Sequence, residues 1–331
     1  MSEAPNRAPA GYQVLQRLGA GRTAVVWLAR EAVAAREVAL KLPRPDLQSD
    51  AVLRRMFENE VQITLKLDHP HVVRAFAGRP TGPEAFLALE YCAGGTLDQL
   101  LLERGRLPIE MATRLVHEVA MGLLHTHERR VLHRDVKPAN VFIDGDGHAK
   151  LGDFGTGTFQ AEDAEERVGT AFYMAPELFE GRSTSVRSDV YSLGVLAYEV
   201  LSGERPFVGA SYEALMVAHL HSLPRDLKAV RPELPARVPR VVSKALSRDS
   251  ERRFPDVASF LAAYREAIGF AAPEAATPPP DASTVGRGGA RRPDGAAGDG
   301  GPGSSRATPV PAVGKAEARP KRGWWPFGRR R

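Results

Sequence analysis

Two short motifs at a fixed distance in the middle of the chain constrain its fold most strongly. Residues 133–140 begin with His133-Arg134-Asp135 and end on Asn140, and Asp153-Phe154-Gly155 follows thirteen positions later. The amide of Asn140 and the carboxylate of Asp153 are oxygen groups that suit a metal ion, and Asp135 could act as a base. This arrangement is typical of phosphoryl transfer, which depends on positioned oxygen and cationic groups.

The apolar pattern changes from strand-like to helix-like along the chain. Between Tyr12 and Leu89, short strand-like runs surround one helical stretch, and from Leu97 onward helical spacing dominates. The sequence therefore predicts a small strand-rich lobe followed by a larger helical lobe. The predicted strands are 24–29, 37–41 and 86–90, and the predicted helices are 50–67, 108–128, 188–201, 210–221, 238–246 and 254–268.

The end of the chain differs from the rest in composition. From 271 to 331, 11 residues are Gly and 10 are Pro, and long aliphatic residues nearly vanish. Such a segment cannot bury enough apolar surface to offset the entropy lost on ordering. We expect 270–331 to be a disordered Pro/Gly/Arg-rich tail.

Charge and cysteine content narrow the class of protein. The tail holds 11 Lys and Arg against 5 Asp and Glu, so 34 basic and 35 acidic residues remain in 1–270, and the net charge of +5 belongs to the tail. Nucleic-acid binding by the folded part is therefore disfavoured. The single cysteine, Cys92, suits a reducing compartment. Without an apolar run of 18 residues or an apolar signal core, we expect a cytoplasmic protein with no transmembrane segment.

A glycine-rich turn and a lysine precede these motifs. Gly19-Ala20-Gly21 alone is shared with dinucleotide-binding turns, but the run Val25-Val26-Trp27-Leu28 predicts a strand where a dinucleotide fold needs a helix. We therefore expect a hairpin folded over phosphates. Lys41 ends an apolar strand-like run, and Glu60 on the next predicted helix could fix its ammonium group.

Taken in order, these motifs resemble the eukaryotic-type (Hanks-type) protein Ser/Thr kinases, most of all the bacterial members. The resemblance covers about residues 11–269 and implies an α+β, two-lobed protein-kinase-like fold. Its small antiparallel β lobe with one helix would span about 11–92, and its larger helical lobe about 93–269. The residues that carry it are Gly19, Gly21, Lys41, Glu60, His133-Arg134-Asp135, Lys137, Asn140, Asp153-Phe154-Gly155, Ala175-Pro176-Glu177, Asp189 and Arg253.

The resemblance implies a catalytic role for each polar residue of the two central motifs. Asp135 would orient the substrate hydroxyl and accept its proton, and Lys137 would neutralise charge on the transferred phosphate. Thr170 would bridge Asp135 and Lys137. Asn140 and Asp153 would ligate Mg²⁺, with Mn²⁺ as the alternative metal.

The resemblance also implies a site for ATP. Lys41, held by Glu60, would contact the α and β phosphates below the loop that contains Gly19 and Gly21. The adenine would lie between apolar side chains and hydrogen-bond to the backbone of Glu90 and Cys92. The apolar set is Leu18, Val26, Ala39, Leu89 and Phe142, with Leu89 in the gatekeeper position. Ala24 stands where the kinase loop usually has a third glycine.

Three further features have structural interpretations. Asp189 is either an acid that complements a helix dipole or, by the resemblance, a buried acceptor for the backbone of the 133–135 loop. Glu177 and Arg253 resemble an ion pair that ties the end of the activation segment to the large lobe. The histidines His125, His127 and His219 lack ligand spacing, so we expect surface or core positions and no zinc site.

Lys137 and Gly169-Thr170-Ala171 match the Ser/Thr rather than the tyrosine kinases.

The segment between Phe159 and Gly169 has an unusual composition. Residues 160–168 contain no Ser or Thr but four carboxylates, Glu162, Asp163, Glu165 and Glu166. Our hypothesis is that one of them replaces an activating phosphate at Arg134; an acidic loop that only contacts solvent remains equally open. The remaining hydroxyls for that phosphate are Thr156, Thr158 and Thr170.

The last eleven residues place aromatic rings between cations. Trp324, Trp325 and Phe327 lie among lysines and arginines, a mixture that suits an anionic membrane surface or a protein partner. Stacking on nucleic acid and a merely solubilising basic end stay open. The tail hydroxyls that could accept autophosphorylation are Thr277, Ser283, Thr284, Ser304, Ser305 and Thr308.

Two classes of function remain. The first is an ATP-dependent Ser/Thr kinase that modifies protein substrates in signalling and also itself. The alternative is a pseudokinase-like scaffold that binds nucleotide and recruits partners through its tail. The first is favoured because a scaffold does not need the whole set Lys41, Glu60, Asp135, Lys137, Asn140 and Asp153. A Rossmann oxidoreductase is a distant third.

Overall fold

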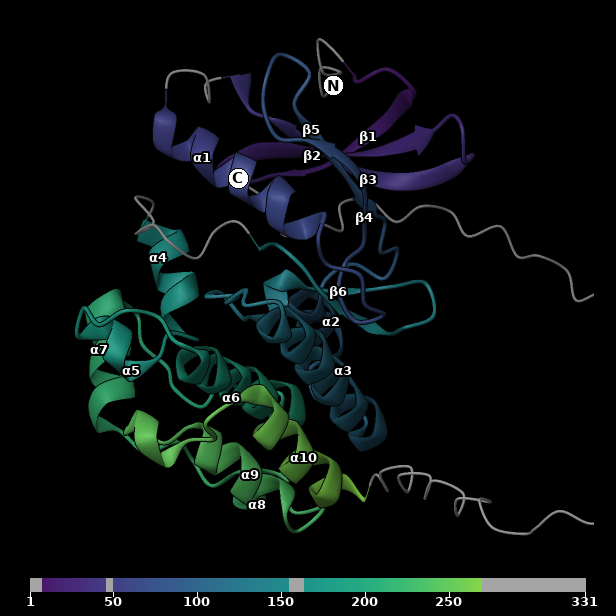
Figure 1. The fold of residues 1–331 in the computed structure, drawn as a ribbon. Helices are drawn as coiled ribbons and strands as arrows, with labels where there is room; N and C mark the ends of the chain where they lie inside the picture. Colours follow the sequence, from purple (N-terminus) through teal and green to yellow (C-terminus); the bar gives the residue numbers. More distant parts are fainter. Residues whose placement is uncertain (1–7, 46–49, 155–163, 270–331) are drawn as a thin grey trace, which may run out of the picture. The chain divides into compact units, whose positions relative to one another are not determined.

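The computed structural model describes residues 8–45, 50–154 and 164–269, with backbone alone for 164–167. Its first part is a five-stranded antiparallel sheet with the strand order β1-β2-β3-β5-β4. Figure 1 shows this sheet with helix α1 beside it. The strands are β1 (Tyr12–Ala20), β2 (Ala24–Glu31), β3 (Arg36–Pro43), β4 (Ala75–Arg79) and β5 (Phe86–Glu90).

The glycine-rich turn lies at the tip of the β1–β2 hairpin. Gly19 pairs with Val26 across the two strands, and the N–H of Gly21 donates to the carbonyl of Ala24 at 2.8 Å. The predicted hairpin is confirmed. Because a strand and not a helix follows the turn, the Rossmann alternative is wrong.

Within residues 8–45 and 50–92, the small lobe has one α-helix, α1 (Ala51–Thr64). Asp50 begins it, since its Oδ1 accepts hydrogen bonds from the N–H groups of Val52 at 2.8 Å and Leu53 at 3.1 Å. The helix ends three residues before the predicted end at Leu67. The N–H of Leu67 bonds to the carbonyl of Thr64, a tighter i to i−3 contact that closes the last turn.

Alternation along β3 decides which side chains face the site. Val38 and Leu40 belong to an apolar cluster on one face of the sheet, together with Trp27. Ala39 belongs to the cluster on the opposite face, which includes residues of α1. Because successive side chains point to opposite faces, Lys41 shares the face of Ala39 and lies toward α1.

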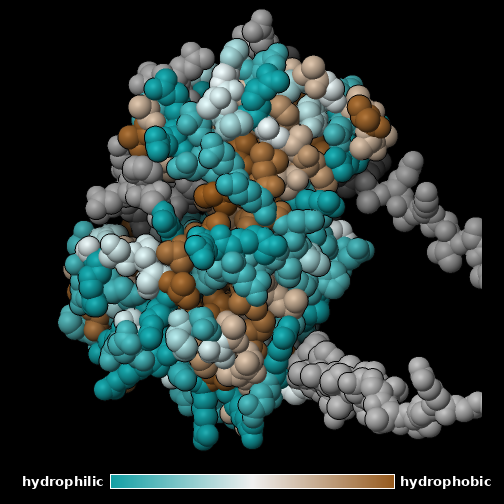
Figure 2. Space-filling view, in the orientation of Figure 1, coloured by the Kyte–Doolittle hydropathy of each residue, from teal (hydrophilic) through white to brown (hydrophobic). Residues whose placement is uncertain are grey.

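The later part of the chain is mostly helical. Its core is one apolar cluster to which α3, α6, α9 and α10 contribute, and a small sheet of β6 (Val141–Ile143) and β7 (Ala149–Leu151) lies next to α3. Hydrophilic side chains cover most of the visible face in Figure 2. The helices are α2 (Leu97–Arg104), α3 (Ile109–Glu128), α4 (Ala164–Ala171), α5 (Pro176–Phe179), α6 (Val186–Ser202), α7 (Tyr212–His221), α8 (Leu227–Val230), α9 (Val238–Ala245) and α10 (Val257–Ile268).

The observed helices begin where a polar side chain caps them. Helix α7 starts after Ser211, whose hydroxyl accepts from the N–H of Ala214, and not at the predicted Ala210. Helix α10 starts after Asp256, whose carboxylate accepts from the N–H of Ser259 at 2.7 Å, and not at Phe254. The sequence analysis gives no bounds for β1, whose presence the predicted hairpin implies, and does not predict β4, β6 or β7. Strands β6 and β7 have three residues each, and β4 has five, none of them buried. Of the described helices, none combines the length and the apolar character that crossing a membrane requires.

Candidate active site

Lys41 lies between two buried carboxylates. Its ammonium group contacts the carboxylate of Glu60 from α1, and it donates to Oδ1 of Asp153 at 3.0 Å. All three side chains are less than a tenth exposed. The predicted contact between Lys41 and Glu60 is therefore present, and it connects strand β3, helix α1 and the segment after β7.

These contacts set the charge of the two groups that would face a nucleotide. Burial alone would lower the pKa of Lys41, but the negative charges of Asp153 and Glu60 outweigh burial and raise that pKa. Burial opposes ionisation of Asp153, and the positive charge of Lys41 outweighs it and lowers the pKa of the carboxyl group. Lys41 is thus held as a cation and Asp153 as an anion.

A second group of polar side chains surrounds Asp135. Its Oδ2 lies 2.8 Å from Nζ of Lys137, and this Nζ donates to Oγ1 of Thr170 at 3.0 Å. The three predicted residues therefore meet, with Lys137 and not Thr170 in the middle. Oδ1 of Asp135 is buried and has no hydrogen-bond partner among the described residues. A donor from a substrate hydroxyl would relieve this unfavourable state.

Asn140 and Asp153 offer the oxygen atoms that a divalent cation needs. The amide nitrogen of Asn140 donates to the backbone carbonyl of Asp135 at 2.8 Å and to its Oδ2 at 3.0 Å. The carbonyl oxygen of Asn140 is therefore the atom that could ligate a metal. Within the described ranges, no cluster of three or more His, Cys, Asp or Glu side chains could hold a metal ion by itself. The residues fit Mg²⁺, which usually shares few protein oxygens with substrate phosphates.

Asp189 fixes the loop that carries the catalytic motif. Its Oδ2 accepts from the N–H of His133 and its Oδ1 from the N–H of Arg134, both at 2.8 Å. Oδ2 also lies 2.8 Å from Nε2 of His127 in the last turn of α3. The interpretation as a buried acceptor for this loop is confirmed. The sequence does not predict this contact of His127 with Asp189. Its one signal is that His127 stands six residues before His133.

Glu177 and Arg253 form the predicted ion pair. Nη1 and Nη2 of Arg253 donate to the two carboxylate oxygens of Glu177 at 2.8 and 2.7 Å. The guanidinium also donates to the carbonyls of Ser247 at 2.7 Å, Arg248 at 2.9 Å and Arg187 at 3.1 Å. Because Arg253 is fully buried, the pair connects α5 to the end of the large lobe through a complete set of hydrogen bonds.

The five side chains predicted around an adenine lie together. They are members of one buried apolar cluster on the α1 side of the sheet, which also contains Cys92: Leu18, Val26, Ala39, Leu89 and Phe142. Leu89 and Phe142 line a small cavity next to Lys41, Glu60 and Asp153. The N–H of Glu90 already donates to the carbonyl of Arg74 at 2.8 Å, so Glu90 could serve an adenine only through its carbonyl oxygen.

Several predicted features lie outside the described residues. They are Gly155, Thr156 and Thr158, the carboxylates Glu162 and Asp163, the side chains of Glu165 and Glu166, and the whole tail 270–331. The hypothesis that an acidic side chain binds Arg134 therefore stays a prediction. Arg134 itself is exposed.

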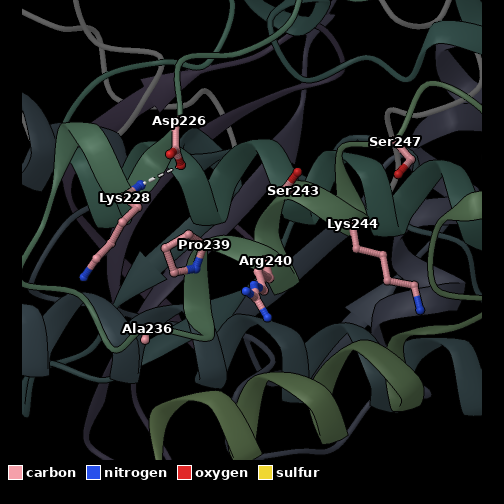
Figure 3. Close-up of a pocket in the computed structure, with 8 residues that line it drawn as sticks. All are labelled: Asp226, Lys228, Ala236, Pro239, Arg240, Ser243, Lys244 and Ser247. Atoms are coloured by element: carbon pink, nitrogen blue, oxygen red, sulfur yellow. Dashed lines mark hydrogen bonds between the residues drawn. The ribbon is translucent and has the colours of Figure 1, made fainter.

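A larger cavity of about 570 Å³ opens elsewhere in the large lobe. It contains none of the predicted site residues. Figure 3 shows that its polar side chains come from α8, α9 and the segments next to them. The lining residues are Asp226, Lys228, Ala236, Pro239, Arg240, Ser243, Lys244 and Ser247.

Comparison with known proteins agrees with this geometry. Residues 12–261 match the family model for the protein kinase domain. A serine/threonine-protein kinase PknA of Corynebacterium glutamicum is 35% identical over 256 residues, which are 75% of this chain and 54% of that protein. The serine/threonine-protein kinase PknB of Mycobacterium tuberculosis is 34% identical over 268 residues, 78% of this chain and 43% of that protein. The chain thus spans about half the length of the curated relatives it matches.

A solved structure supports the same relationship. The kinase domain of Mycobacterium tuberculosis PknI superimposes with a TM-score of 0.62 at 30% sequence identity, over 80% of this chain and 100% of that one. Its similarity extends over both the strand-rich and the helical part. The chain therefore belongs to the eukaryotic-type protein kinase family, among its bacterial-like members.

Proposed function

We propose that residues 11–269 form an ATP-dependent protein kinase domain that transfers the γ-phosphoryl group of ATP to Ser or Thr hydroxyls of protein substrates and of the chain itself. Its small lobe would span about 11–92 and its large lobe about 93–269. The observation that carries this proposal is the group of Asp135, Lys137 and Thr170, in which one buried oxygen of Asp135 has no partner in the part of the chain that the structure describes. A scaffold that only binds nucleotide has no need of that arrangement.

In this proposal, each group acts on the position or the charge of the reactants. Oδ1 of Asp135 accepts a hydrogen bond from the substrate hydroxyl and then its proton. Lys137, already next to Asp135, meets the negative charge of the transferred group. Because the transition state of phosphoryl transfer is loose, these residues contribute mainly by positioning and electrostatics.

The nucleotide would occupy the space between the sheet and the catalytic loop. Lys41 would contact the α and β phosphates, while Gly19 and Gly21 allow the backbone of the hairpin to approach them. Mg²⁺, held by Asn140 and Asp153, would supply positive charge to the phosphates. We expect Mg²⁺ to support more activity than Mn²⁺, and a titration of each metal against initial rate checks this.

The tail carries a proposal of its own, which rests on sequence alone. We propose that Trp324, Trp325 and Phe327, with the cations around them, contact an anionic membrane surface or a protein partner of an otherwise cytoplasmic protein. Co-sedimentation of the full chain with anionic vesicles should exceed that with neutral vesicles. Equal sedimentation with both would leave the partner as the remaining contact.

The proposed activity is tested by incubating the purified full chain with labelled ATP, Mg²⁺ and a mixture of Ser/Thr peptides. We expect label in the wild type and a loss of about 10³-fold or more in Asp135→Asn, since that change removes the proton acceptor and leaves the hydrogen bonding of the loop similar in shape. Mass spectrometry then maps the modified residues. ATP binding without any transfer by the wild type would favour the scaffold.

A further inference from the structure

Four side chains form a cluster at the segment that follows Thr170. Phe172 and Tyr173 follow this threonine, and Glu199 and Arg205 come from the end of α6 and the loop after it. The hydroxyl of Tyr173 donates to Oε2 of Glu199, and Nε of Arg205 donates to its Oε1 at 3.1 Å. Both oxygens of this carboxylate are thus occupied by side chains of the chain itself.

The arginine, not the glutamate, forms the accessible part of the cluster. The side chain of Arg205 is 39% exposed, whereas that of Glu199 is 12% exposed. The guanidinium lies over the ring of Phe172, with 4.0 Å between its carbon Cζ and the ring centroid. Stacking on an aromatic ring holds the planar group in one orientation. The guanidinium also forms a hydrogen bond with Tyr173. Its five N–H donors outnumber these contacts with Glu199 and Tyr173.

This cluster is close enough to the reaction to meet a substrate. Thr170 contacts Lys137, which contacts Asp135, and Phe172 is only two residues beyond Thr170. Two residues span at most about 7.6 Å between Cα atoms. An extended peptide rises about 3.3 Å per residue, so a side chain within about three positions of the acceptor hydroxyl can reach Phe172 and Arg205.

We infer that Arg205, stacked on Phe172 and anchored by Glu199, selects protein substrates that carry an aspartate or glutamate within three residues of the phosphorylated Ser or Thr. The inference rests on the proposed kinase activity and names the substrate class of that site. The same arginine disfavours substrates with a basic residue there. It repels a cation, and it already binds the carboxylate of Glu199, which would otherwise attract one.

One neighbouring charge works in the opposite direction. Asp98 of α2 acts electrostatically on Glu199, and its own Oδ1 accepts from the hydroxyl of Thr96 at 2.6 Å. If the negative charges of Asp98 and Glu199 determined which peptide binds, the enzyme would prefer substrates with a basic residue near the acceptor. Recognition by Arg205 and recognition by these two carboxylates therefore predict opposite substrate preferences.

The test compares kcat/KM for three peptides that differ only in one flanking residue, which is Asp, Ala or Lys, scanned over the three positions on each side of the acceptor. At one position, we expect the wild type to use the Asp peptide about tenfold better than the Ala peptide, since a charge-assisted contact at a partly exposed site contributes about 1.4 kcal/mol. Arg205→Met should bring this ratio to about one, and Arg205→Lys should keep part of it.

The ratio separates recognition from a loss of structure. A purely structural role of Arg205 would lower kcat/KM for the Asp and Ala peptides equally and leave the ratio unchanged. Arg237→Met is the matched control, because it removes another exposed arginine that is ion-paired with a glutamate, Glu266. We expect this control to keep the wild-type ratio.

The outcomes also distinguish this inference from the proposed function. Transfer to all peptides with a ratio of one in the wild type, a preference for Lys, or the same ratio in wild type and Arg205→Met would overturn the role of Arg205 alone. No transfer to any peptide or protein by the wild type would overturn the proposed activity, and this inference with it.

Discussion

Two residues of the site have backbone conformations that non-glycine residues rarely adopt. The φ angle is +68° at Arg134 and +67° at Asp153. Such conformations cost on the order of 1–3 kcal/mol each, and they persist only where neighbouring groups enforce them. At Arg134 the enforcing group is Asp189, whose two oxygens accept the N–H groups of His133 and Arg134. The position of Asp135 therefore depends on Asp189, which lies outside the group of Asp135, Lys137 and Thr170.

The variant Asp189→Asn tests this positioning role. It keeps the shape of the side chain but turns one acceptor into an NH₂ group facing a backbone N–H. We expect the free energy of unfolding to fall by about 2–4 kcal/mol, because buried charge-assisted hydrogen bonds are lost. We also expect kcat to fall more than about tenfold, with a smaller change in KM for ATP. Urea denaturation and steady-state kinetics measure the two effects.

The matched control is Asp256→Asn. Asp256 caps α10 at an exposed position, and asparagine is about as good a cap as aspartate. We expect its stability and kcat to stay near the wild-type values. If Asp189→Asn behaves like this control, the carboxylate does not hold the loop.

At the residue scale, the sequence predicts contacts between residues of the family motifs better than contacts of residues outside those motifs. The contacts of Lys41 with Glu60 and of Glu177 with Arg253 could be expected, because the resemblance supplies both partners. The contacts of Glu199 with Tyr173 and Arg205 could not. Nothing in the local pattern distinguishes such a carboxylate from a solvated one. Arg205 is close in sequence but carries no pairing signal, and Tyr173 meets Glu199 only through the packing of α6 against the segment after Thr170.

At the scale of elements, helix α3 packs unusually closely on the segment between α1 and β4. A Cβ atom added at Gly122 would lie 2.2 Å from the backbone oxygen of His71. The segment around His71 runs from α1 to β4 and also bonds to β7, since the carbonyl of His71 accepts from the N–H of Leu151 at 2.9 Å. The sequence shows only a glycine inside a helix, so this contact could not be predicted from it.

The substitution Gly122→Ala has two opposing effects on stability. Alanine favours an isolated helix by up to about 1 kcal/mol relative to glycine. The backbone oxygen of His71 cannot rotate away as a side chain would, and overpacking of this kind costs about 1–3 kcal/mol. We expect steric repulsion to prevail and the melting temperature to fall by several degrees. Thermal unfolding monitored by circular dichroism measures the change.

Gly145→Ala provides the comparison for this variant. A Cβ atom at Gly145 would meet no atom within 4 Å, and its φ angle is not in the left-handed region. We expect its melting temperature to be within a degree or two of the wild type. A stabilised Gly122→Ala protein would mean that α3 can move away from His71 at little cost.

At the scale of the whole molecule, buried titratable groups of the large lobe make stability depend on pH. His219 of α7 is fully buried, and its Nδ1 lies 2.7 Å from the hydroxyl of Tyr191 in α6. Burial lowers the pKa of His219 to about 4, although the backbone of Phe172 and Ala171 favours the protonated form. Burial would raise the pKa of Glu177, but Arg253 outweighs it and lowers that pKa. The two shifts act in the same direction on the acid side.

The direction follows from proton binding in the two states. Below its ordinary pKa of 6.5, His219 takes up a proton in the unfolded chain, whereas the folded protein takes it up only near pH 4. The unfolded state therefore binds more protons between these values, and the free energy of unfolding decreases as the pH falls through this window. For a shift of this size, the loss is about 3 kcal/mol between neutral pH and pH 4. Glu177 adds a further loss below its ordinary pKa of 4.5.

Urea denaturation of wild type and His219→Gln at about pH 7, 6 and 5 isolates the contribution of this one histidine. The variant should be less stable than the wild type at neutral pH, because a packed ring is lost. Its stability should nevertheless fall less on acidification, so that the two curves converge toward pH 5. His221→Gln, a change at an exposed histidine two residues later, should keep the wild-type slope. Parallel curves for wild type and His219→Gln would assign the acid sensitivity to other groups, since a glutamine has no proton to take up in this range.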